Sequence, residues 1–114
     1  MKIKTGIDIA NISRFREMEY SKNSDFYSKL FDVIEIEYCL SFKDPYPHFT
    51  GKFAVKEAIK KALNTRITFL EIHTRHGDDG EPKIESDLLK DLNVEISISH
   101  DQDYAVAIAI LFEN

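Results

Sequence analysis

The C-terminal segment NVEISISHDQDYAVAIAILF constrains the fold of this chain more than any other part of the sequence. It contains two runs with alternating apolar residues, separated by a polar stretch at His100–Asp103. Alternation with a period of two, interrupted by turn residues, is typical of a β-hairpin. The sequence therefore predicts two antiparallel strands at the end of the chain.

Helical patterns dominate the first half of the chain instead. The strongest covers 48–63, where apolar residues gather on one face and Lys52, Lys56 and Lys60 step by four along the other. We also expect helical segments at 11–20, 25–31 and 32–42, the last broken by DPYPHF at 44–49 because proline removes a donor. Strands are expected at 3–9, 67–75 and 83–85, a turn at 76–82 and a helix at 86–92. The predicted class is α+β.

Length and charge narrow the possible functions. At 114 residues the chain is expected to form one domain, 1–114. Its net charge of −5 argues against nonspecific binding to nucleic acid or to an anionic membrane. No apolar run has the length of a membrane span or the pattern of a signal peptide, which predicts a cytoplasmic protein. Cys39 is the only cysteine, so no internal disulfide or cysteine zinc site is expected, and we predict a buried thiol without a nucleophilic role.

The stretch TGIDIANISRF places one acid, Asp8, at the expected end of an apolar strand. A buried ionised carboxylate is costly unless it is paired or binds a metal, but aspartate also caps helices. On the long helix, Glu57 and Lys61 are four residues apart and share a face, where they would form an ordinary exposed ion pair. If Asp8 and Glu57 met, they would instead suit Mg²⁺, which takes one or two carboxylates besides water and phosphate oxygens. Spacing alone leaves both interpretations open.

Three blocks of the sequence carry a family resemblance when they are taken together. GIDIANISRF, GKFAVKEAIKKAL and ISISHDQDYAVA resemble, in order and spacing, the holo-(acyl carrier protein) synthases, the small bacterial type of 4′-phosphopantetheinyl transferase. The resemblance implies transfer of the phosphopantetheine arm of coenzyme A to a serine of apo acyl carrier protein, with Mg²⁺ as cofactor and adenosine 3′,5′-bisphosphate as product. It places the protein in lipid metabolism, in fatty-acid synthesis or a related carrier-protein pathway.

The resemblance also implies a fold and an assembly. The fold is an antiparallel sheet packed against a long helix and shorter helices. Three copies form a homotrimer with active sites at the subunit interfaces, where Asp8 and Glu57 of one subunit meet part of the nucleotide pocket of its neighbour. The apolar run YAVAIAILF fits a central interface or an ordinary core equally well.

Site residues follow from the resemblance position by position. Glu57 has a second candidate role, activation of the attacking serine. The histidines of IHTRHGDD, His73 and His76, match no family site and are expected to be structural or solvated. The implied assignments are Asp8, Glu57 and Lys61 for catalysis, Asp8 and Glu57 for the metal, Lys52, Lys56, Lys61 and His100 for coenzyme A, and Arg14 for the carrier protein.

The sequence departs from the family pattern in three places. Asn64 and Arg66 stand where two glycines usually follow the long helix, and Lys52 stands for an arginine. Asparagine tolerates the left-handed conformation, so the helix end is expected to survive. Arg66 either adds a phosphate contact or obstructs the site, and Lys52 keeps the charge but loses bidentate binding.

These departures keep two other functions open. One is a non-catalytic relative that binds coenzyme A or a carrier protein without transfer, and the NTR stretch favours it. The other is an unrelated Mg²⁺-dependent phosphohydrolase that uses the same two acids, which the S-H-D block disfavours.

Overall fold

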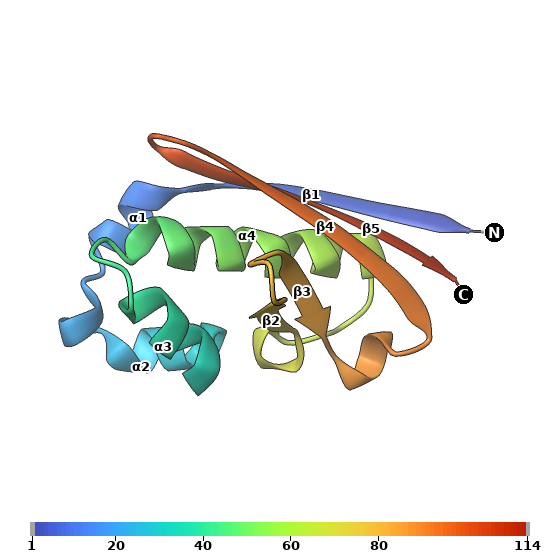
Figure 1. Ribbon diagram of the computed structural model, residues 1–114, viewed down its shortest axis with the longest axis horizontal. Helices are drawn as coiled ribbons and strands as arrows, with labels where there is room; N and C mark the ends of the chain where they lie inside the picture. The colour runs from blue at the N-terminus through green and yellow to red at the C-terminus, as the bar shows by residue number, and fades with distance from the viewer. Residues whose placement is uncertain (1, 114) are drawn as a thin grey trace.

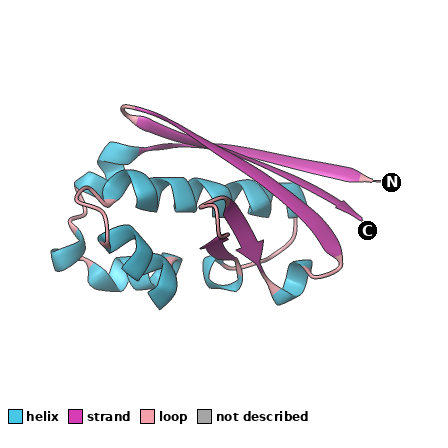
Figure 2. Cartoon of the chain, viewed as in Figure 1, coloured by secondary structure: helices cyan, strands magenta, loops and turns pink. Residues whose placement is uncertain are grey.

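The computed structural model describes residues 2–113 as two antiparallel sheets and a set of helices around one long helix (Figures 1 and 2). The helices are α1 (Ile12–Arg16), α2 (Ser24–Leu30), α3 (Val33–Leu40) and α4 (Tyr46–Leu63). The strands are β1 (Ile3–Asn11), β2 (His73–His76), β3 (Pro82–Glu85), β4 (Leu92–Asp101) and β5 (Tyr104–Glu113). Short 3₁₀ turns lie at Tyr20–Lys22, Phe69–Glu71 and Asp87–Leu89. Among residues 2–113, no helix is both long and apolar enough to cross a membrane.

Helix α4 occupies the middle layer of the molecule. The three-stranded sheet, in the order β1-β5-β4, covers one side of α4, and α2, α3 and the β2–β3 hairpin cover the other (Figure 1). All neighbouring strands are antiparallel, with Asp8 opposite Ala107 and His100 opposite Ala105. The fold class and the terminal hairpin are therefore as predicted.

The contact between β1 and α4 is unusually close. Gly6 faces the helix, and a Cβ atom at this position would lie 1.9 Å from the Ala58 carbonyl oxygen. The central strand β5 also presents only small residues, Ala105, Ala107 and Ala109, before Leu111 on the same buried face. These small side chains bring the backbone of β1 next to α4, which sets the position of Asp8.

The opposite face of this sheet is apolar and exposed. Alternation along β1 turns Ile3, Ile7 and Ile9 away from α4, and each of them is exposed. On β5, Ile108 is paired with Ile7 and is exposed as well. The sheet thus has one face packed on α4 and one apolar face that residues 2–113 leave open.

An aromatic cluster joins α1, α2 and α3 to the N-terminal half of α4. Tyr27 is fully buried, and its ring centroid lies 4.6 Å from that of Phe49 on α4. Its hydroxyl donates to the Met18 carbonyl oxygen at 2.8 Å. Phe15 meets Phe53 edge to face at 5.5 Å. The cluster anchors the short helices, of which α2 and α3 lie beneath α4 in Figure 1.

Several predicted boundaries were wrong. Strand β1 continues past Asp8 to Asn11, so the acid lies within the strand and not at its end. Helix α4 begins at Tyr46, because a proline in the first turn loses no helical hydrogen bond. The predicted strand at 67–75 is a 3₁₀ turn capped by Thr68 over its first part, and only 73–76 is extended. The predicted helices at 11–20 and 86–92 shorten to α1 and to a 3₁₀ turn.

Candidate active site

Asp8 and Lys61 meet where β1 crosses α4. Asp8 faces the helix on the same side of β1 as Gly6, and the Lys61 ammonium donates to Asp8 Oδ1 at 3.1 Å and to the Ile7 carbonyl oxygen at 3.0 Å. The Asp8 side chain is only 12% exposed, and its Oδ2 atom is buried without a hydrogen-bond partner among the described residues. Buried polar atoms are normally paired, so an unpaired carboxylate oxygen in this position indicates a binding site for a ligand.

Glu57 lies one helical turn before Lys61 and therefore on the same side of α4. Its side chain is 29% exposed, and its nearest cation is Lys60, at 3.9 Å from Oε1. The structure thus brings Asp8 and Lys61 into contact and places Glu57 one helical turn from Lys61. Among residues 2–113, no group of three or more histidine, cysteine or acidic side chains could hold a metal ion.

The residues present fit a magnesium ion with few protein ligands. The unpaired Asp8 Oδ2 supplies one hard oxygen donor, and Glu57 supplies a second carboxylate that is not tightly paired. Mg²⁺ typically takes one or two carboxylates and completes its octahedron with water and phosphate oxygens. Two carboxylates on neighbouring elements match that preference.

Lys52 and His100 lie at the other end of α4, on the walls of a cavity of about 110 Å³. His100 Nε2 is 3.0 Å from the Pro47 carbonyl oxygen, and it approaches α4 at Gly51, where a Cβ would lie 3.1 Å away. Lys52 is buried, and its ammonium is 3.0 Å from Thr74 Oγ1 and 3.1 Å from His76 Nε2. Burial lowers the pKa of Lys52. The structure brings these two predicted coenzyme contacts to one cavity.

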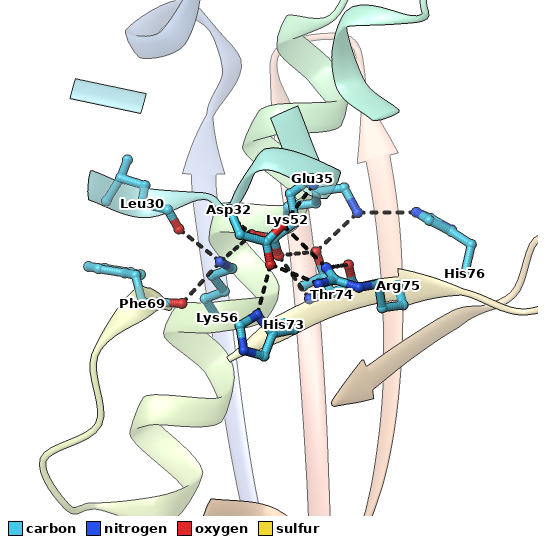
Figure 3. A network of polar contacts seen from close by, with 10 residues as sticks. All are labelled: Leu30, Asp32, Glu35, Lys52, Lys56, Phe69, His73, Thr74, Arg75 and His76. Carbon is cyan, nitrogen blue, oxygen red and sulfur yellow. Dashed lines mark hydrogen bonds and ion pairs between the residues drawn. The ribbon is translucent and has the colours of Figure 1, made fainter. Parts of the chain in front are cut away.

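The prediction for Lys56 was wrong, because its ammonium has no donor left for a coenzyme phosphate (Figure 3). The side chain is fully buried and donates to Glu35 Oε1 at 2.7 Å, to the Leu30 carbonyl at 2.8 Å and to the Phe69 carbonyl at 3.0 Å. An ammonium has three donors, and all three are used. Burial lowers the pKa of Lys56, and the charge of Glu35 opposes that shift. Lys56 joins α3, α4 and the 69–71 turn.

Glu35 is the centre of a network that the sequence did not reveal (Figure 3). Besides Lys56, it accepts from the backbone N–H groups of Asp32 and Thr74, each at 2.8 Å. Asp32 in turn caps α3 and binds His73 and Arg75 of β2, at 2.7 and 2.9 Å. The spacing of Asp32 and Glu35 at the start of a helix is a capping-box signal, which could have located this cluster.

Two histidines and the cysteine have structural environments. His73 binds Asp32 Oδ2, and His76 stacks on the Tyr38 ring with centroids 4.0 Å apart. Cys39 is fully buried, and burial raises the pKa of its thiol to about 12, as expected for a residue without a nucleophilic role. His76 departs from the expectation in one respect, since it contacts Lys52 directly.

Arg14 lies on α1 at the edge of an apolar pocket of about 130 Å³. Its neighbour Arg16 is neutralised by Asp44, with two contacts of 2.7 and 2.9 Å. No ion pair of Arg14 appears within 2–113. The other residues that line the pocket are Phe15, Met18, Phe26 and Phe53.

The two family glycine positions behave differently. Asn64 adopts the left-handed conformation, with φ of 53°, and its N–H donates to the Lys60 carbonyl oxygen, so the helix end survives as predicted. Arg66 is exposed and, with Lys29 and Lys60, lines an open groove of about 700 Å³ beside Phe69.

Lys52 and Lys61 point to opposite sides of α4. Nine residues separate Lys52 from Lys61, which corresponds to a rotation of about 180° and a rise of ~14 Å. Their contacts agree, since Lys61 binds β1 and Lys52 binds β2. The two groups of one subunit therefore do not share a cleft.

This chain is similar to known proteins in sequence and in fold. Residues 4–109 match the 4′-phosphopantetheinyl transferase superfamily. The holo-[acyl-carrier-protein] synthase of Finegoldia magna is 39% identical over 116 residues, covering 97% of both chains. That of Thermodesulfovibrio yellowstonii is 36% identical over 110 residues, covering 93% of this chain and 95% of the other.

Solved structures of similar fold lead to the same family. The Bacillus anthracis holo-(acyl-carrier-protein) synthase, in complex with CoA (3′,5′-ADP), has a TM-score of 0.85 and 29% identity over 97% of this chain and 96% of that one. The Helicobacter pylori enzyme in complex with coenzyme A has a TM-score of 0.82 and 30% identity, covering 95% and 99%. The chain therefore belongs to the 4′-phosphopantetheinyl transferase superfamily. Within it, these relatives are holo-[acyl-carrier-protein] synthases, which confirms the resemblance seen in the sequence.

Proposed function

We propose that this protein transfers the 4′-phosphopantetheine arm of coenzyme A to a serine hydroxyl of an apo acyl carrier protein and releases adenosine 3′,5′-bisphosphate. The observation that carries the proposal is the Asp8–Lys61 pair with its unpaired, buried carboxylate oxygen. The coenzyme bound in the similar B. anthracis and H. pylori structures supports the same substrate. We expect the reaction to take place in the cytoplasm.

Asp8 and Glu57 would hold Mg²⁺, which would offset negative charge on the pyrophosphate when bound. Lys61 presents its ammonium beside Asp8, where it can stabilise the leaving group. In the reaction, the serine oxygen bonds to the phosphorus next to pantetheine, and the bond from that phosphorus to the bridging oxygen breaks. Glu57, which is partly exposed and weakly paired, accepts the serine proton directly or through a water molecule.

A homotrimer would complete the site. Lys52 contacts β2 and His100 lies on β4, whereas Lys61 contacts Asp8 on β1, at the other edge of the sheet, so one coenzyme molecule would contact both groups across a subunit interface. The exposed apolar face formed by Ile3, Ile7, Ile9 and Ile108 is a suitable surface for that interface.

Arg14 is the proposed contact for the carrier protein. Its charge has no ionic partner among the described residues, and it stands beside an apolar pocket. An acidic carrier that inserts one apolar side chain would match both features. Arg16 is a weaker candidate, since Asp44 already neutralises it.

The experiment incubates the protein with coenzyme A, Mg²⁺ and several apo carrier proteins and weighs each carrier by mass spectrometry. We expect a gain of one phosphopantetheine group. Asp8→Ala and Glu57→Gln should reduce the rate at least about 100-fold, as for loss of a metal ligand or its electrostatic support. Asp91→Asn, an exposed acid remote from the site, is the matched control. Coenzyme binding without any mass gain would favour the non-catalytic relative, and near-normal rates in either variant would refute the metal assignment.

A further inference from the structure

The Lys52 ammonium is held by two hydrogen-bond acceptors that belong to the β2 strand. Thr74 Oγ1 lies at 3.0 Å and His76 Nε2 at 3.1 Å, and residues 2–113 offer its third N–H no acceptor. The side chain also passes over the Tyr38 ring, with 4.7 Å from Nζ to the ring centroid. Lys52 is therefore held in one place with one donor to spare.

The two acceptors are themselves fixed. His76 Nδ1 is 3.3 Å from the Gly80 carbonyl oxygen, which only a protonated Nδ1 can satisfy, so Nε2 is left as an acceptor for Lys52. The Thr74 hydroxyl is 2.5 Å from Glu35 Oε2 and must donate to it, which turns the lone pairs of Oγ1 toward Lys52. Glu35 is locked in turn by Lys56.

The cavity beside Lys52 suits one anionic group. Its lining includes Lys52, the three histidines His48, His76 and His100, and Arg75, whose guanidinium is already paired with Asp32. The rest is largely apolar, and no acidic residue contributes to it. At about 110 Å³ it is far smaller than a pocket that encloses a whole ligand. It can thus receive a phosphate of a larger molecule.

We infer that His76 and Thr74 are positioning residues, which hold the Lys52 ammonium at the cavity so that it binds a phosphate of coenzyme A. The inference rests on the proposed function, which supplies the coenzyme. Lys52 lacks the planar fork of the arginine expected at this position, so its single spare donor must be aimed by neighbours. His76 does this as a neutral imidazole that is stacked on Tyr38.

The test measures the dissociation constant for coenzyme A by calorimetry, with kcat and KM for transfer alongside. His76→Leu should weaken coenzyme binding about tenfold and raise KM similarly, with kcat within about twofold of wild type. His76→Gln keeps a neutral acceptor and should bind within about threefold of wild type. Thr74→Val should resemble His76→Leu, and Thr74→Ser should resemble the wild type. His73→Leu, which changes the other β2 histidine and has no contact with Lys52, is the matched control.

Two further arms separate positioning from a general structural effect. In a Lys52→Met background, His76→Leu should weaken binding by less than about twofold, because the residue it acts through is gone. The second arm repeats the binding measurements with dephospho-coenzyme A, which lacks the 3′-phosphate. If the variants lose affinity for coenzyme A alone, Lys52 binds that phosphate. If they lose affinity for both ligands, Lys52 binds the pyrophosphate.

The inference is overturned if His76→Leu binds as well as wild type, if Leu and Gln weaken binding equally, or if the effects of His76→Leu and Lys52→Met add in full. In those cases a wild type that still transfers phosphopantetheine leaves the proposed function standing. A wild type that binds no coenzyme A refutes both.

Discussion

Replacing Lys56 by methionine is predicted to destabilise the fold and not to weaken coenzyme binding directly. The substitution removes one partner of a pair in which both side chains are fully buried, 2.7 Å apart. Glu35 keeps a buried charge, and the carbonyl groups of Leu30 and Phe69 lose their donor. Breaking such a pair costs about 3–5 kcal/mol, a large part of the ~5–15 kcal/mol that stabilises a domain of this kind.

The matched control is Lys60→Met, one turn further along α4. Lys60 is 32% exposed, lies 3.9 Å from Glu57 Oε1 and stands over the Phe69 ring at 4.1 Å from its centroid. Its loss should cost about 1 kcal/mol or less. The difference in unfolding free energy between the two variants therefore measures the effect of burial and hydrogen bonding at Lys56.

Urea unfolding followed by circular dichroism gives both free energies, provided that the m-value stays constant. A double variant, Glu35→Met with Lys56→Met, should cost less than the sum of the single changes, because no unpaired charge remains. The reasoning is refuted if the unfolding free energy of Lys56→Met lies within about 1 kcal/mol of the wild-type value, and above all if the affinity of this variant for coenzyme A falls at the same time.

Three other perturbations test different parts of the structure. Gly6→Ala puts a methyl group 1.9 Å from the Ala58 carbonyl and should lower the unfolding free energy by about 1–3 kcal/mol or more; an unchanged melting temperature would contradict the close contact. Burial alone would raise the pKa of Asp32, but hydrogen bonds from the Glu35 N–H, Arg75 and His73 lower it to about 2. The pKa is depressed on folding, so about 2 kcal/mol of stability is present above an unfolded pKa of 3.8 and is lost as pH falls toward about 2. Asp32→Asn should make the unfolding free energy, measured with urea at a series of pH values, depend less on pH in this range. An unchanged pH dependence would refute the assignment. Arg66→Gly should raise KM for coenzyme A about two- to fivefold, whereas a gain in rate would show that the arginine obstructs the site.

The sequence predicted the parts of the fold whose patterns are local. Alternation along 93–113 and the helical stripe on 48–63 both depend on neighbours within a few residues, and both elements formed. The strand prediction for 67–71 was wrong. Ile67, Phe69 and Leu70 have strand propensity, but Thr68 caps a turn there and donates its backbone N–H to the Glu71 carboxylate. Such short polar caps act against propensity and are easily overlooked.

The candidate site was predictable only in part. Asp8 and Lys61 lie 53 residues apart in sequence, so their contact depends on the close approach of Gly6 to α4, which no local pattern encodes. Only the family resemblance placed them together. The roles of Glu35, Thr74 and His76 were missed for the same reason, since each acts through a residue on another element.

The lysines at positions 52, 56 and 60 show why equal spacing does not imply equal environment. A step of four residues advances about 400° around a helix, so each lysine is displaced by about 40° from the one before. The first two fall under the layer of α3 and β2, where Glu35 and Thr74 stabilise their buried charges, and the third emerges beside Phe69. A buried ammonium needs acceptors, and these come from elements outside α4. The covering layer therefore decides which lysine is structural, which faces the cavity and which meets solvent.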